Sequence, residues 1–142
     1  MRALLDVNVL IALLDSDHAS HEVAMSWFAA HAGEGWASCP ITQNGCVRIM
    51  SNASYPNALP VQAVMSHLAD ACEQDVHEFW PDRVSLLDPE AIDPTRIHGP
   101  RQLTDIYLLA LAVACEARFV TFDGKIPLAA VRNAKPQNLL VL

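Results

Sequence analysis

Several features that define other classes of protein are missing from this sequence. Its four cysteines form no CxxC pair, so neither a zinc ribbon nor a dithiol redox site is indicated. It has no glycine-rich phosphate loop and no nucleophile-elbow pattern. The longest apolar run, residues 106–115, is far shorter than the roughly 20 residues of a membrane-spanning helix. Because no signal peptide is recognisable either, we expect reduced cysteines, no contact with membranes and a cytoplasmic location.

Basic residues are also scarce. Nine Lys and Arg stand against 16 Asp and Glu, which gives a net charge of −7. Bulk attraction to nucleic acid is therefore not expected, and any such binding must come from a local basic strip, a metal ion or a partner. The apolar fraction of 52% and the charged fraction of 18% are typical of a compact globular chain. We expect one domain that spans residues 1–142.

Short apolar runs alternate with segments of helical periodicity along the whole chain. Such alternation predicts parallel strands that are connected by helices. We expect strands at residues 2–5, 36–39, 76–80, 84–87, 119–122 and 139–142, and helices at residues 9–14, 20–33, 42–50, 60–72 and 104–115. The predicted fold class is therefore α/β, a three-layer α/β/α sandwich with a mostly parallel central sheet.

Three aspartates occupy positions that an acidic metal site would need. Asp6 and Asp123 each end an apolar run, and Asp105 stands at the start of a long apolar helix. If the two runs are neighbouring parallel strands, their carboxyl ends lie where ligands bind in α/β sheets. Three carboxylates at one point repel each other unless a cation neutralises them. Oxygen ligands favour Mg²⁺ or Mn²⁺, which points to phosphodiester chemistry.

Each of these residues also has a plainer interpretation. Asp6 would cap the helix that follows it, Asp105 would sit favourably near a positive helix end, and the Asp123-Gly dipeptide is typical of a turn. Their joint placement is what favours a functional site. Two polar neighbours would support it: Thr121 shares the sheet face of Asp123, and Asn8 lies two residues after Asp6.

Four cations are candidate phosphate contacts: Arg48, Arg96, Arg101 and Lys125. Arg101 and Lys125 are favoured because they flank Asp105 and Asp123 in the sequence. Ordinary solvated surface charge remains the alternative for each of them.

Taken together, segments 1–10, 103–105 and 120–123 resemble a PIN domain, and the segment 39–49 is similar to a stretch found in VapC-type toxins of bacterial toxin–antitoxin pairs. The resemblance implies a Mg²⁺- or Mn²⁺-dependent endoribonuclease that cleaves RNA, forms a homodimer and is neutralised by a VapB-like antitoxin. It places the metal on Asp6 and Asp105, makes Asp123 a third catalytic acid, and gives Asn8 a supporting role.

The sequence departs from that family in one respect. The family normally supplies a further acid, usually glutamate, from the helix after the second strand, whereas no acid occurs between Glu34 and Asp70. Gln43 or Asn44 would then serve as a neutral substitute. The alternative function is a catalytically weak or inactive PIN-fold module that binds RNA or protein. A third hypothesis, phosphotransfer through an aspartyl phosphate, lacks an adjacent acidic pair on the first strand.

Overall fold

A computed structural model describes residues 1–142. Its centre is a five-stranded sheet in which every neighbouring pair of strands is parallel, with the order β3-β2-β1-β4-β5. The strands are β1 (Ala3–Leu5), β2 (Trp36–Ser38), β3 (His77–Phe79), β4 (Arg118–Thr121) and β5 (Leu139–Val141). The α-helices are α1 (Val7–Leu14), α2 (His21–His31), α3 (Pro40–Met50), α4 (Val61–Cys72) and α5 (Leu103–Ala114).

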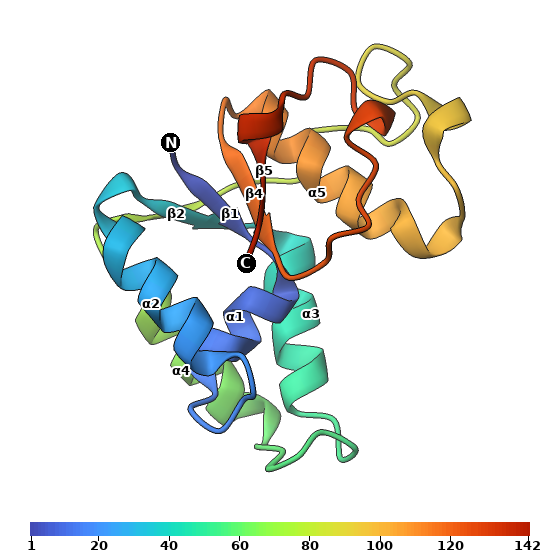
Figure 1. The fold of residues 1–142 in the computed structure, drawn as a ribbon. Helices are drawn as coiled ribbons and strands as arrows, with labels where there is room; N and C mark the ends of the chain where they lie inside the picture. The colour runs from blue at the N-terminus through green and yellow to red at the C-terminus, as the bar shows by residue number, and fades with distance from the viewer.

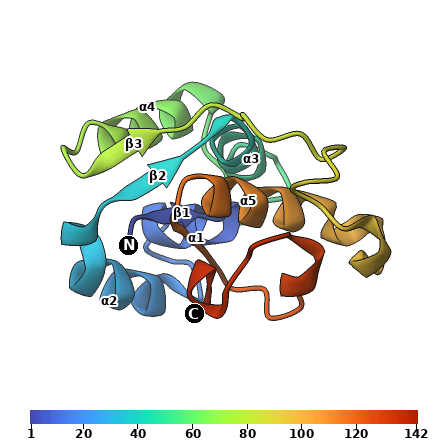
Figure 2. The ribbon, with the colours of Figure 1, turned by 90° about the horizontal axis from the view of Figure 1, so that it is seen from above.

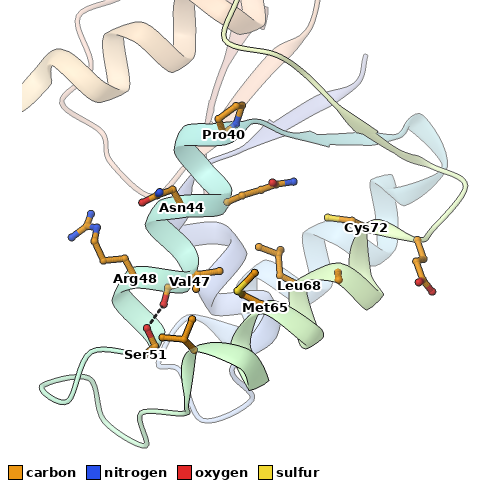
Figure 3. A pocket seen from close by; sticks show the side chains of 12 residues that line it. Pro40, Asn44, Val47, Arg48, Ser51, Met65, Leu68 and Cys72 are labelled. Atoms are coloured by element: carbon orange, nitrogen blue, oxygen red, sulfur yellow. Dashed lines mark hydrogen bonds between the residues drawn. The ribbon is translucent and has the colours of Figure 1, made fainter.

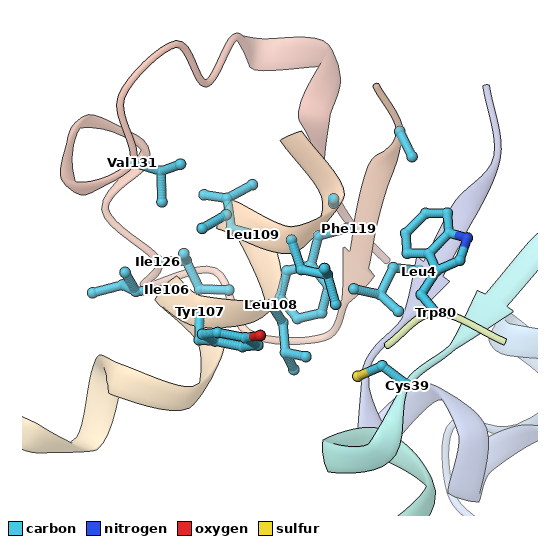
Figure 4. Packing of buried hydrophobic residues seen from close by; sticks show 14 of the residues in the cluster. Leu4, Cys39, Trp80, Ile106, Tyr107, Leu108, Leu109, Phe119, Ile126 and Val131 are labelled. Carbon is cyan, nitrogen blue, oxygen red and sulfur yellow. The ribbon is translucent and has the colours of Figure 1, made fainter. Parts of the chain in front are cut away.

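Helices cover both faces of this sheet, which confirms the predicted three-layer α/β/α sandwich (Figures 1 and 2). One core lies under α5, where Ile106, Leu108 and Leu109 pack with Leu4 and Phe119 of the strands (Figure 4). A second core lies on the other face, where α1, α3 and α4 pack against alternate residues of β1, β2 and β4. No helix has both the length and the apolar character to cross a membrane.

Helix α5 is buried almost all round, as its apolar sequence predicted. Every residue from Ile106 to Ala112 is buried, so the start of this helix is held firmly against the sheet. The fixed start matters because Asp105 lies in the first turn.

The structure corrects one expected strand and the starts of two expected helices, and the first of these helices, α1, begins at Val7 and not at residue 9. Residues 84–87 form no strand: Val84 and Leu86 pack against the α5 core, whereas Leu87 is 89% exposed and no neighbouring strand is available to pair with. Helix α3 begins at Pro40, two residues earlier than the expected Thr42. Proline suits the first helical position, and the Thr42 hydroxyl accepts a hydrogen bond from the Cys39 backbone N–H at 3.0 Å.

The register of the two central strands determines which residues meet at the edge of the sheet. Leu5 of β1 lies opposite Val120 of β4, and the Asp6 backbone N–H donates to the Val120 carbonyl at 2.9 Å. Asp6 therefore emerges beside Thr121, at the carboxyl ends of two adjacent parallel strands. This is the arrangement that the sequence predicted for Asp6 and Asp123.

Candidate active-site cleft

Asp6 links the end of β1 to the start of α1. Its carboxylate accepts one hydrogen bond from the Val7 backbone N–H at 2.7 Å and a second from the Thr121 hydroxyl at 2.6 Å. Only 5% of the residue is exposed, and this burial raises the pKa of Asp6, an effect that the two hydrogen bonds oppose and the charge of Asp123 reinforces. Asp6 thus caps α1 and also presents a carboxylate at the sheet edge, so its two interpretations are compatible.

Asp105 reaches the same place from the first turn of α5. Burial is the main reason that its pKa is raised to about 7, and the neighbouring carboxylates of Asp6 and Asp123 also contribute. The positive end of a helix normally favours an ionised acid, so burial, together with the repulsion by the two neighbouring carboxylates, outweighs that attraction here. The three aspartates predicted from the sequence are therefore close enough to affect one another's ionisation.

Asp123 also has two roles in the local structure. Its carboxylate accepts a hydrogen bond from the Lys125 backbone N–H at 2.8 Å, which is the turn geometry expected of Asp-Gly. Its own backbone N–H donates to the Thr121 hydroxyl at 3.0 Å. Thr121 is fully buried and therefore connects Asp123 to Asp6 through a single hydroxyl group. The predicted contact of Thr121 with the acidic cluster is confirmed.

A cleft of about 520 Å³ opens where Asp6 and Asp105 meet. Asn8, which is exposed on the first turn of α1, lies on its wall as expected, whereas Asp123 does not line the cleft. The residues that line the cleft are Asp6, Val7, Asn8, Pro40, Ile41, Asn44, Gly45, Arg48, Ile49, Asp82, Thr104 and Asp105.

One acidic residue of this cleft was not predicted. Asp82 comes three residues after β3 ends at Phe79, and it lines the cleft together with Asp6 and Asp105. Its position shortly after a strand could have indicated it, by the same argument that identified Asp6. The segment around it is rich in proline, which is typical of a surface loop, so Asp82 was not predicted as a site residue.

The two amides proposed as substitutes for the missing acid point in different directions. The Gln43 side chain donates from Nε2 to the Ser38 hydroxyl at 2.9 Å and faces α4, so it does not line the cleft. Asn44 does line the cleft, and it also borders the hollow between α3 and α4 (Figure 3). Asn44, not Gln43, therefore occupies the place where α3 faces the acids.

The favoured phosphate contacts lie elsewhere. Arg101 stands in the turn before α5 and Lys125 in the turn after Asp123; both are exposed, and neither lines the cleft. Arg48 is the cation that does so. Proximity in the sequence to Asp105 or Asp123 therefore does not determine which candidate cation lines the cleft; the face of α3 on which Arg48 lies does.

The cleft can be tested for its fit to a divalent cation. No three His, Cys, Asp or Glu side chains are clustered tightly enough to enclose a metal ion by themselves. Asp6 and Asp105 are nevertheless desolvated carboxylates that repel each other, as their raised pKa values indicate. A cation would relieve this repulsion, and carboxylate and amide oxygens are the donors that Mg²⁺ and Mn²⁺ prefer. The donor set fits such an ion.

A larger hollow of about 930 Å³ lies between α3 and α4 (Figure 3). Its walls include Val47, Met65 and Leu68, and its single acidic side chain is Glu73. One carboxylate beside apolar side chains offers little to a metal ion. The acidic cleft is therefore the better candidate for chemistry.

Comparison with known proteins agrees with this fold. The model of the PIN domain family matches residues 3–132. Ribonuclease VapC44 of Mycobacterium tuberculosis (strain ATCC 25618 / H37Rv) is 54% identical over 142 residues, which is 100% of both chains. The chain therefore belongs to the PIN-domain family. Within that family it is a toxin of the VapC type.

Two solved structures share the fold at low sequence identity. The crystal structure of Mycobacterium tuberculosis VapC20, described as a sarcin-ricin loop cleaving toxin, matches with a TM-score of 0.60 and 13% identity, over 94% of this chain and 99% of that one. VapBC2 from Rickettsia felis, bound to a DNA fragment from the promoter, matches with a TM-score of 0.56 and 15% identity, over 87% and 89% of the two chains.

Proposed function

We propose that this protein is a Mg²⁺-dependent endoribonuclease toxin that hydrolyses RNA phosphodiester bonds, with Mn²⁺ as an alternative cofactor. The observation that carries the proposal is the convergence of Asp6 and Asp105 on one cleft at the carboxyl ends of parallel strands. The full-length relative is named a ribonuclease, which agrees with such chemistry. PIN-domain membership further supports it.

Asp6 and Asp105 would hold the cation. When bound, a divalent cation polarises a phosphate and lowers the pKa of a water molecule. The Thr121 hydroxyl orients the Asp6 carboxylate, and Asp123 adds negative charge near Asp105. Asn8 of α1 and Asn44 of α3 offer amide groups to water or substrate from the wall of the cleft. The proposed role of these side chains is to bind the cation and to position the water and the substrate.

The same site predicts the character of the neutralising partner. The cleft carries the carboxylates of Asp6, Asp82 and Asp105, so a VapB-like antitoxin that enters it would present arginine or lysine. VapC-type membership and the VapBC2 neighbour support such a partner. The family resemblance further predicts a homodimer. Sedimentation of the purified toxin, alone and with its antitoxin, would measure both assemblies.

Cleavage of total cellular RNA by antitoxin-free protein tests the proposed activity. We expect discrete fragments with Mg²⁺ or Mn²⁺, and none with EDTA or with Asp105→Asn. Asp70→Asn on α4 is the matched control, since Asp70 is exposed and lies outside the cleft. Intact RNA after incubation of folded wild-type protein with metal would count against the nuclease.

A second candidate is a weak or inactive module that binds RNA or protein without cutting. It is favoured by one observation: α3 presents Asn44 to the cleft where the family usually supplies an acid. A lower ligand charge reduces metal affinity. Asn44→Glu distinguishes the two functions, because it would restore an acid at this wall. Activity that appears only in this variant would favour the inactive module.

A further inference from the structure

Arg48 is the single cation among the residues that line the acidic cleft. It lies on α3 one turn after Asn44, and both residues line the acidic cleft and also border the hollow between α3 and α4 (Figure 3). Three carboxylates share this cleft, those of Asp6, Asp82 and Asp105. A lone guanidinium in an acidic cleft would ordinarily be expected to pair with one of them.

No such pair forms. The two salt bridges of the structure join the N-terminus to Glu34 and Arg2 to Glu78, and Arg48 donates no hydrogen bond. Several other arginines have a bonding partner: Arg83, Arg118 and Arg132 each donate to a backbone carbonyl. The Arg48 guanidinium is exposed, so its planar set of N–H donors is available to a ligand.

The backbone that carries Arg48 is held rigidly. Gly45 brings α3 against α1, where an added Cβ would lie 2.8 Å from a methyl group of Val7. Cys46 and Met50 on the same helix are buried in the core. Arg48 therefore extends a mobile side chain from a fixed point on the cleft wall. A site on a rigid helix positions a ligand better than one on a loop.

We propose that Arg48 binds a phosphate of the RNA substrate and holds the strand against the acidic cleft. This inference rests on the proposed nuclease function. A chain of net charge −7 needs a local cation to receive RNA, and the carboxylates of the cleft repel a phosphate until they are neutralised. Arginine suits this task because its guanidinium can donate two parallel hydrogen bonds to one phosphate. Arg48 is then a positioning residue outside the metal site.

RNA binding provides the direct test. The probe is a fluorescein-labelled single-stranded RNA of mixed sequence, titrated in Mg²⁺ with protein that carries Asp105→Asn so that the probe stays intact. Arg48→Ala and Arg48→Lys are compared in this background with Arg96→Ala. Arg96, another of the four candidate phosphate contacts, is the matched comparison, since it is an exposed arginine in the turn 94–96 and lies outside the cleft.

We expect Arg48→Ala to weaken binding about tenfold, as for the loss of one charge-assisted contact. The slope of log K against log salt should fall by about one, because one phosphate contact is lost. Arg48→Lys should keep that slope while it recovers only part of the affinity, and Arg96→Ala should change neither quantity. In nuclease-competent protein, Arg48→Ala should raise KM more than it lowers kcat.

Equal affinity and equal salt slope for Arg48→Ala and Arg96→Ala would overturn the role of Arg48. If wild-type protein still cleaves RNA in that case, the nuclease proposal survives and only this inference fails. If the Asp105→Asn parent binds no RNA and wild-type protein cleaves none, both proposals fall together. Thermal unfolding of each variant excludes misfolding as the cause of a loss.

Discussion

The Thr121 hydroxyl donates a 2.6 Å hydrogen bond to the Asp6 carboxylate and joins residues that are 115 positions apart in the sequence. Both side chains are buried, and they lie at the ends of adjacent parallel strands. The same hydroxyl accepts from the Asp123 backbone N–H. One oxygen atom therefore connects the first strand, the fourth strand and the turn that holds the third acid.

Removal of this hydroxyl should destabilise the protein. Thr121→Val keeps the shape of the side chain but leaves a buried carboxylate and a backbone N–H each short of one partner, at a cost of about 1–3 kcal/mol. Thr95→Val is the matched control, because Thr95 makes a similar 2.6 Å bond to Asp93 at the exposed surface. Urea unfolding measures both variants. Equal losses of unfolding free energy in the two variants would mean that burial does not increase the contribution of the Thr121–Asp6 hydrogen bond to stability.

The stability of metal-free protein should fall as the pH rises through the range set by Asp105. Its pKa is 3.8 in the reference state and about 7 when folded, so the neutral acid is favoured by folding. The stability from this group is fully present below about pH 4 and is lost as the pH approaches about 7. Asp105→Asn should abolish this decline and gain at least about 1 kcal/mol at pH 7.5 over wild type. Unfolding of the wild type and the variant in EDTA, between about pH 4 and about pH 7.5, measures this pH dependence of stability.

A loss of stability in Asp105→Asn at neutral pH would contradict this prediction. It would favour the plainer interpretation, in which Asp105 is chiefly an acid that stabilises the start of α5. Asp70→Asn, at an exposed site on another helix, should show no pH-dependent difference from wild type.

Divalent metal should stabilise the wild-type protein and not Asp105→Asn. Binding to the folded state alone raises stability by about 2.7 kcal/mol when the metal is present at about 100 times its Kd. Because Asp105 must ionise to bind, the gain should grow as the pH rises through about 7. Thermal shifts in Mg²⁺ and Mn²⁺ at several pH values test this. An identical shift for the variant would place the metal elsewhere.

Gly45→Ala should destabilise the protein although alanine is the better helix former. The new methyl group would lie 2.8 Å from Val7, and overpacking of this kind costs about 1–3 kcal/mol. Gly33→Ala has open space and should be neutral or slightly stabilising. If the clash is the cause, Val7→Ala should restore much of the loss in Gly45→Ala. Urea unfolding of the two single variants and the double variant measures the coupling.

Much of the acidic cluster could be predicted from the sequence because strand ends carry positional information. Asp6 and Asp123 each follow an apolar run, and parallel strands bring their carboxyl ends to one edge of the sheet. The apolar character of α5 likewise predicted a fixed start for Asp105. These predictions require only the apolar runs in the sequence and a parallel arrangement of the strands. The alternation of strands and helices predicts that arrangement.

The rest of the cleft depends on how whole elements are oriented. Whether Gln43 or Asn44 faces the acids is set by the rotation of α3, which follows from the close approach of Gly45 to Val7. Asp82 lies on a segment that is neither helix nor strand, so no periodic sequence pattern predicts where its side chain lies. The expected strand at residues 84–87 failed for a related reason, since a β-like pattern forms a strand only where a neighbouring strand is available.

The bond between Asp6 and Thr121 also bears on the order in which the molecule is made. Asp6 is synthesised 115 residues before Thr121, so its buried carboxylate has no side-chain partner until β4 has been made and has entered the sheet beside β1. Asp105 and Asp123 arrive equally late in the chain. A nascent toxin therefore cannot complete its acidic cluster until β4 has been made, and a chain released before β4 lacks both Thr121 and Asp123.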